Sequence, residues 1–104
     1  MSAARAVTYA WHPGVATRTL DGTAFILLGS RMLSLNPVGT HIWEQFEAGA
    51  TVKRAAKAVV KEFETTDEVA MADTAKFVEE LLARQLVVAR QGRAVGGSRT
   101  ERGR

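Results

Sequence analysis

The side chains that most often carry catalysis are few in this chain and lie in unrelated contexts. There are two histidines, His12 and His41, and no cysteine among 104 residues. The histidines are not at metal-ligand spacing to each other or to a carboxylate-rich loop. Neither Ser30 nor Ser34 has a base within a recognisable motif, and no glycine-rich phosphate loop is present. We therefore expect no enzyme activity, no bound metal and no cofactor.

The best organised stretch is residues 31–49, where a strand pattern is followed by a helix pattern. Asn36 and Pro37 form a helix-start signal, because the asparagine side chain can accept a bond from a free helical N–H and proline has a helical φ. We predict an amphipathic helix from there to Gly49. The preceding strand alternates between two faces. One face would carry Met32 and Ser34, and the other Arg31, Leu33 and Leu35.

Two further strands are predicted before this stretch. Residues 15–20 have a strand pattern, and the Asp21-Gly22 dipeptide is typical of the tight turn into a second strand, residues 23–28. The continuous apolar run at residues 25–28 predicts a strand that is covered on both faces. The three strands would form an antiparallel sheet. Its last strand has only one neighbour in sequence, so its other edge is a candidate for an open edge.

Two more helices are predicted in the C-terminal half. Thr51 would cap the first, and the Thr65-x-x-Glu68 pattern is typical of a capping box for the second, residues 66–84. The fold class is therefore α+β and winged-helix-like, with a three-stranded antiparallel sheet followed by a three-helix bundle. The first of these two helices has a basic face, which is either solvated or docks on an acidic enzyme or peptide. Its members are Lys53, Arg54, Lys57 and Lys61.

The longest helix has more apolar surface than one small sheet can cover. Ala70, Thr74, Phe77 and Leu81 form a core-facing stripe, and a second stripe lies roughly 80° to 160° further round. The second stripe packs either on the N-terminal tryptophan region and the valines near residue 87, or forms one wall of a groove. The other wall would be the open strand, to which an extended peptide adds. The candidate peptide-binding residues are Arg31, Met32, Leu33, Ser34, Leu35, Met71, Ala75, Val78 and Leu82.

Charge and composition suggest three regions. The net charge is +3, and residues 89–104 contain five arginines against one glutamate, or +4, so the remainder carries −1. We expect an extended arm at residues 1–12, a peptide-binding domain at 13–88 and a disordered basic tail at 89–104. No apolar stretch resembles a signal sequence or could span a bilayer. With no cysteine to require oxidation, we expect a cytoplasmic protein.

The order and spacing of these motifs resemble the coenzyme PQQ synthesis protein D (PqqD) family over Pro13 to Val88. The resemblance implies a peptide chaperone that binds the leader of a ribosomally made precursor peptide against the third strand and third helix. It also implies presentation of that peptide to a modifying enzyme, often a radical SAM protein, in PQQ or other peptide biosynthesis. The chain departs from the family at Arg54-Ala55 and at Gln85, where glycine is common. The resemblance is carried by Pro13-x-Val15, Leu20-Asp21-Gly22, Phe25-Ile26-Leu27-Leu28, Leu33-x-Leu35-Asn36, Gly39-x-x-Ile42-Trp43, Gly49-x-Thr51-Val52, Asp73, Phe77, Leu81 and Leu86-Val87.

Two other functions compete with peptide binding. A winged-helix protein could bind DNA, but residues 67–84 hold five acids against two bases, or −3, which disfavours an approach to phosphates. We therefore expect no nucleic acid partner through the domain itself. The second alternative is an oligomerising scaffold, such as a homodimer that pairs through Tyr9 and Trp11.

Overall fold

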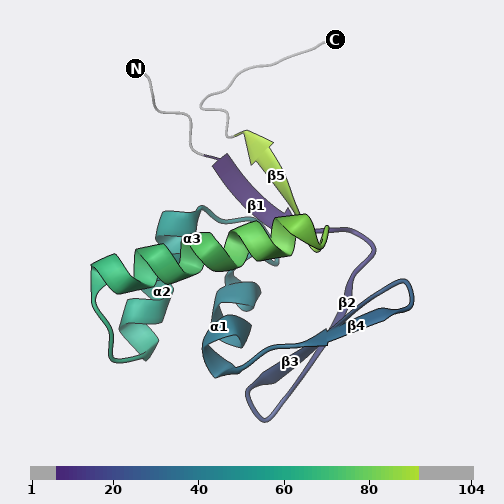
Figure 1. Cartoon of the computed structure of the whole chain (residues 1–104), viewed down its shortest axis with the longest axis horizontal. Helices are drawn as coiled ribbons and strands as arrows, with labels where there is room; N and C mark the ends of the chain where they lie inside the picture. The colour runs from purple at the N-terminus through teal and green to yellow at the C-terminus, as the bar shows by residue number, and fades with distance from the viewer. Residues whose placement is uncertain (1–6, 92–104) are drawn as a thin grey trace.

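The computed structural model describes residues 7–91, which form five strands and three helices (Figure 1). Strands β2, β3 and β4 make a three-stranded antiparallel sheet in that order, and β1 and β5 make a separate antiparallel ribbon. The ribbon and the sheet lie on opposite sides of α3 in Figure 1. The elements are β1 (Val7–Trp11), β2 (Ala16–Leu20), β3 (Thr23–Leu28), β4 (Arg31–Ser34), α1 (Pro37–Gln45), α2 (Val52–Glu62), α3 (Asp67–Ala83) and β5 (Val87–Gln91).

The predicted α+β class, with its three-stranded antiparallel sheet and three helices, is confirmed, but the chain is not a sheet followed by helices. The two ends of the described range meet in the ribbon, where Val7 pairs with Gln91 and Trp11 with Val87. Residues 89–91, which composition assigned to a disordered tail, therefore belong to β5. Composition cannot detect this pairing, because the bonds in a ladder come from the main chain. Residues 1–6 and 92–104 lie outside the described range.

The hairpin of β2 and β3 forms as predicted, with Asp21 at φ 50° and Gly22 at φ 77° in the turn. Two positive φ values match the twist that a two-residue hairpin needs. The prediction that β3 is covered on both faces is wrong. Ile26 is buried, but Phe25 and Leu27 are 36% and 45% exposed on the outer face. The helices pack against only one side of the sheet, so alternate residues of the apolar run face away from the core.

Helix α1 begins as predicted. The Asn36 side chain accepts a hydrogen bond of 2.7 Å from the Gly39 N–H, and Pro37 occupies the first helical position. The helix ends at Gln45, one turn before the predicted end, because the Phe46 N–H bonds to the Trp43 carbonyl and tightens the last turn.

The N-caps of α2 and α3 also form when a side-chain oxygen accepts a bond from a helix N–H, but the cap of α3 is one residue later than predicted. The Thr51 hydroxyl accepts a bond of 3.1 Å from the main chain and starts α2, as predicted. Helix α3 is capped by Thr66, whose hydroxyl accepts from the Val69 N–H at 3.2 Å, so the predicted capping box at Thr65 is wrong by one residue. Gln85 follows α3 at φ 63°, in the left-handed conformation that glycine adopts more readily.

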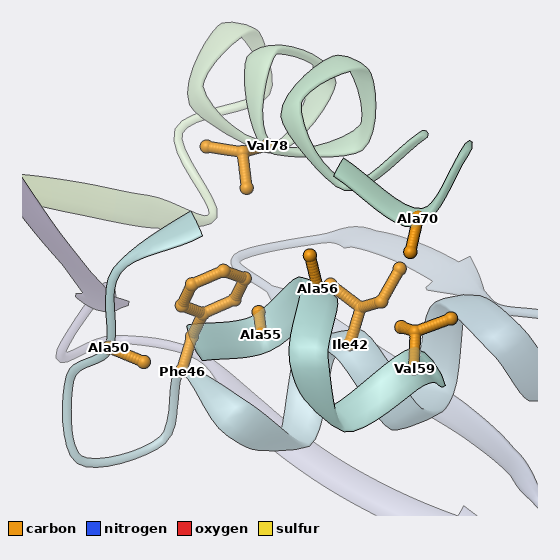
Figure 2. Packing of buried hydrophobic residues seen from close by; sticks show 8 residues of the cluster. All are labelled: Ile42, Phe46, Ala50, Ala55, Ala56, Val59, Ala70 and Val78. Carbon is orange, nitrogen blue, oxygen red and sulfur yellow. The ribbon is translucent and has the colours of Figure 1, made fainter. Parts of the chain in front are cut away.

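The core consists of two clusters on either side of α1. Figure 2 shows the first, in which small side chains of α2 and α3 let the helices pack closely around Ile42 and Phe46. The second joins the inner face of the sheet to α1, α3 and the start of β5. It is centred on the fully buried Trp43. The Trp11 ring stacks on Trp43 with centroids 4.8 Å apart, which fastens β1 to this second cluster.

Candidate functional site

Strand β4 has an unpaired edge in the described part of the chain. It pairs with β3 on one side only. The N-terminal segment does not close the other side, because β1 is held elsewhere. One side of β1 pairs with β5, and on the other side the Tyr9 N–H donates to the Ala50 carbonyl at 2.8 Å. The edge that the sequence predicted to be open is therefore open in this structure.

The hydrogen-bond register identifies which main-chain groups face the open edge. The Leu35 N–H donates to the Ala24 carbonyl at 2.9 Å, so this opposed pair is of the hydrogen-bonded type. Such pairs alternate along an antiparallel ladder, which makes Ile26 and Leu33 the next one. Met32 and Ser34 lie between these pairs. Their N–H and C=O groups consequently point away from β3, where an added strand could bond to them.

A groove of about 560 Å³ lies beside this edge. One wall is the end of β4, the other is α3, and the first turns of α1 close it. Gly39 lies at the closed end beside Phe77, where a Cβ would be in ordinary contact with Cζ of Phe77 at 3.5 Å and in a tighter one with Oδ1 of Asn36 at 3.2 Å. The volume is in the range of ligand-binding clefts. The groove is lined by Leu33, Ser34, Leu35, Asn36, Val38, Gly39, Ile42, Asp73, Phe77, Glu80, Leu81 and Arg84.

The β4 residues of the predicted site are brought together at this groove. Leu33, Ser34 and Leu35 line it directly. Arg31 and Met32 border a smaller adjoining hollow of about 40 Å³, which Arg84 also lines. The strand half of the predicted site is therefore contiguous.

The predicted helical half of the site is not at the groove. Val78 is buried in the first core cluster. Met71 and Leu82 are exposed, at 41% and 36%, and Ala75 is exposed beside them, but none of the three lines the groove. The sequence assigned Phe77 and Leu81 to the sheet-covered core. In the structure Leu81 is buried in the second core cluster, as predicted, and Phe77 is half-buried against both clusters. Both side chains also line the groove.

The groove also includes charged residues of α3 that the sequence analysis did not assign to the site: Asp73, which it named only for the family resemblance, and Glu80 and Arg84. Asp73, Glu80 and Arg84 lie one turn or less from Phe77 or Leu81 on the helix surface. Charged side chains that flank an apolar stripe are usually solvated, which is why the pattern did not identify them. The signal that could have identified them is their spacing, since each lies three or four residues from Phe77 or Leu81 and therefore on the same face of the helix.

The two histidines both contact neighbouring residues of the fold. His12 is half-buried, and its Nδ1 accepts a bond of 2.9 Å from the Gly14 N–H. His41 is also half-buried and packs edge-on against Phe63. In residues 7–91, no three His, Cys, Asp or Glu side chains gather where they could hold a metal ion. None of the helices in the described range is long and apolar enough to cross a membrane.

The fold and the groove define a small α+β domain that offers an unpaired strand edge beside a helix, an arrangement suited to an added peptide strand. The chain belongs to the coenzyme PQQ synthesis protein D (PqqD) family, whose model matches residues 18–87. No curated protein sequence matches the chain.

Two solved structures share the fold. One is TbiB1 in complex with the TbiA(beta) leader peptide, with a TM-score of 0.70, 20% identity, and coverage of 75% of this chain and 93% of that one. The other is lasso peptide synthetase B1 complexed with the leader peptide, with a TM-score of 0.68, 20% identity, and coverage of 77% and 96%. At this identity the likeness establishes the fold.

Proposed function

We propose that this protein is a recognition element that binds the leader of a ribosomally synthesised precursor peptide as an added strand on β4. The observation that carries the proposal is the open edge itself. Met32 and Ser34 turn their main-chain groups outward, directly beside the apolar groove. An added strand gains affinity from main-chain bonds and specificity from alternate side chains that enter pockets.

Family membership and the two related structures support this proposal. Both solved relatives are complexes with leader peptides. A leader strand beside β4 would lie about 4.8 Å from it. Every second side chain of the leader would then enter the groove against Phe77 and Leu81. The proposed site keeps residues 31–35 from the sequence analysis and replaces Met71, Ala75, Val78 and Leu82 by this groove wall.

The proposal also covers the partner enzyme, the client peptide and the location of the protein. The protein would hold the peptide without catalysing its modification, and a separate enzyme, such as a radical SAM protein, would act on it. The client would be the PQQ precursor or another modified peptide, in the cytoplasm. A homodimer through Tyr9 and Trp11 is left out of the proposal, because these rings contact Phe46 and Trp43 of the same chain.

DNA binding is the second candidate, through a winged-helix-like use of α3. The charge of this helix opposes it, since a recognition helix has to approach phosphates. A gel shift that survives deletion of residues 92–104 would favour this candidate. The deletion starts at residue 92 so that β5 stays intact.

The proposed function can be tested by NMR titration of the ¹⁵N-labelled protein with the precursor peptide encoded beside its gene. We expect the largest shifts at residues 31–36 and at Asp73, Phe77 and Leu81. A peptide with the same composition in scrambled order serves as the control. Shifts confined to β2 or α2 would contradict the proposal.

A further inference from the structure

The groove is charged differently at its two ends. Arg84 lies on the groove wall near the C-terminal end of α3, and Arg31 lies beside it, donating from Nη2 to the Arg84 carbonyl at 2.9 Å. That bond holds the Arg31 guanidinium at this end. Asp73 lines the groove almost three helical turns earlier in α3. The groove therefore has a cationic end and an anionic end.

The contacts place these two ends relative to β4 and α1. The Arg31 bond puts the cationic end where β4 begins. Gly39 faces the Phe77 ring, so Asp73, one turn before Phe77, lies toward the start of α1. Glu80 lies between the ends and offsets part of the charge of Arg84, but Arg31 leaves this end with an excess of positive charge.

The distance between the ends corresponds to a short strand. Arg84 and Asp73 are eleven residues apart in sequence, or about 16 Å along a helix. An extended chain covers this distance in about five residues. The first and last of five residues, i and i+4, point to the same face of a strand, so both side chains can face the same helix wall.

We propose, resting on the function proposed above, that this charge polarity orients the guest strand. The groove takes a peptide with an acidic side chain at the Arg31 and Arg84 end and a basic side chain four residues away in sequence, on the same face of the guest strand, at the Asp73 end. Main-chain bonding to Met32 and Ser34 alone is compatible with either direction of the guest. The charges give the guest strand a different affinity in each of the two directions. Exposed ion pairs of this kind change affinity by roughly two- to fivefold each.

The test uses two synthetic peptides with the same apolar alternation. One carries Glu near its N-terminus and Lys four residues later, on the same face of the strand, and the other has the two charges exchanged. Each carries a nitroxide at its acidic end. We expect both peptides to broaden the amide signals of Arg31, Met32 and Leu86. Broadening that follows the N-terminus of the peptide, whichever charge it carries, would overturn the inference while leaving strand addition in place.

A variant with the charges of the groove exchanged, Arg84→Asp with Asp73→Arg, sharpens the test. We expect the acidic end of both peptides to move to the other end of the groove and to broaden Val38 and Gly39. The matched control exchanges charges on the solvated side of the same helix, Lys76→Asp with Glu79→Arg, and should leave the broadening unchanged. If the control variant shifts the broadening to Val38 and Gly39 as much as the groove variant does, the inference is overturned. Absence of binding by both peptides would contradict the proposed function as well.

Discussion

Strands β1 and β4 are both short and both end next to α1, yet one is enclosed and the other is open. Strand β1 has β5 on one side and residues 46–50 on the other, and its Tyr9 and Trp11 rings pack on Phe46 and Trp43. Strand β4 has β3 on one side and a groove on the other.

The difference separates stability from binding within one small domain. The aromatic side chains of β1 give it enough buried surface to be held by its own chain. Strand β4 has no aromatic residue, and its Met32 is 68% exposed. Its main-chain groups remain available for a partner. We therefore expect substitutions near β1 to change stability and substitutions at the edge of β4 to change binding.

The largest effect is expected for Trp43→Ala, beneath β1. Trp43 has no exposed surface, and its removal should lower the free energy of unfolding by about 3–5 kcal/mol. Urea unfolding followed by circular dichroism measures this change. Met32→Ala, at the open strand, should stay within about 0.5 kcal/mol of wild type. Equal losses of unfolding free energy in Trp43→Ala and Met32→Ala would contradict the assignment of stability to the β1 region and binding to β4.

Trp11→Ala should have the next largest effect, about 2 kcal/mol, because Trp11 is only half-buried. The substitution removes the stacked ring and the bond of 2.9 Å from Nε1–H to the Trp43 carbonyl. Trp11→Phe keeps an aromatic ring and loses the bond, which should cost about 1 kcal/mol. Thermal melting of both variants gives the comparison. A variant that melts like wild type would show that β1 is not fastened by this contact.

At the open edge, Ser34→Pro should weaken peptide binding by about tenfold and change stability little. Proline removes an N–H that points away from β3, so a guest strand loses a donor while the β3 ladder stays intact. Thr19→Pro is the matched control, because Thr19 lies opposite Ala24 on β2 with its N–H also directed outward. Fluorescence anisotropy with a labelled leader peptide measures both. A larger loss for Thr19→Pro would place the peptide on the β2 edge.

Thr74→Val tests the enclosed side of α3. The Thr74 hydroxyl is buried and has no hydrogen-bond partner within residues 7–91, and valine has nearly the same shape. Replacement should stabilise the protein by about 1 kcal/mol, since an unsatisfied buried hydroxyl carries a desolvation cost. Urea unfolding measures the gain, and peptide affinity should not change. A loss of stability would mean that the hydroxyl is satisfied in solution.

The smallest effect is expected at the turn from α3 into the enclosed ribbon. Gln85 is in the left-handed conformation, and the Leu86 N–H bonds to the Leu81 carbonyl at 2.9 Å in the pattern that usually has glycine at this position. Gln85→Gly should raise the free energy of unfolding by about 0.5–1 kcal/mol. Gln85→Ala, which keeps a Cβ, should bring no such gain. Equal stabilities of the two variants would show that the backbone is not strained here.

The strand half of the candidate site was predictable because its pattern is local. Alternation in residues 31–35, followed by Asn36 and Pro37, fixed the strand, its two faces and the start of α1. The helical half was not predictable in the same way. The stripe predicted to face the core does so, since Ala70, Thr74 and Leu81 are buried. The sequence did not show that the groove lies beside this same stripe: Val78 was assigned to the groove and is in the core, whereas Phe77 packs against the core and also lines the groove.

By itself the sequence determined the turns, most of the caps and the order of strands and helices from β2 to α3, because each depends on a few neighbouring residues. The tertiary structure alone decided three further features: the partner of β1, the place of the groove beside the core-facing stripe of α3, and the exposure of the outer face of β3. Each of these is set by the sum of many contacts between residues that are distant in sequence. A short sequence pattern carries no information about contacts between distant residues, so it could not predict these features.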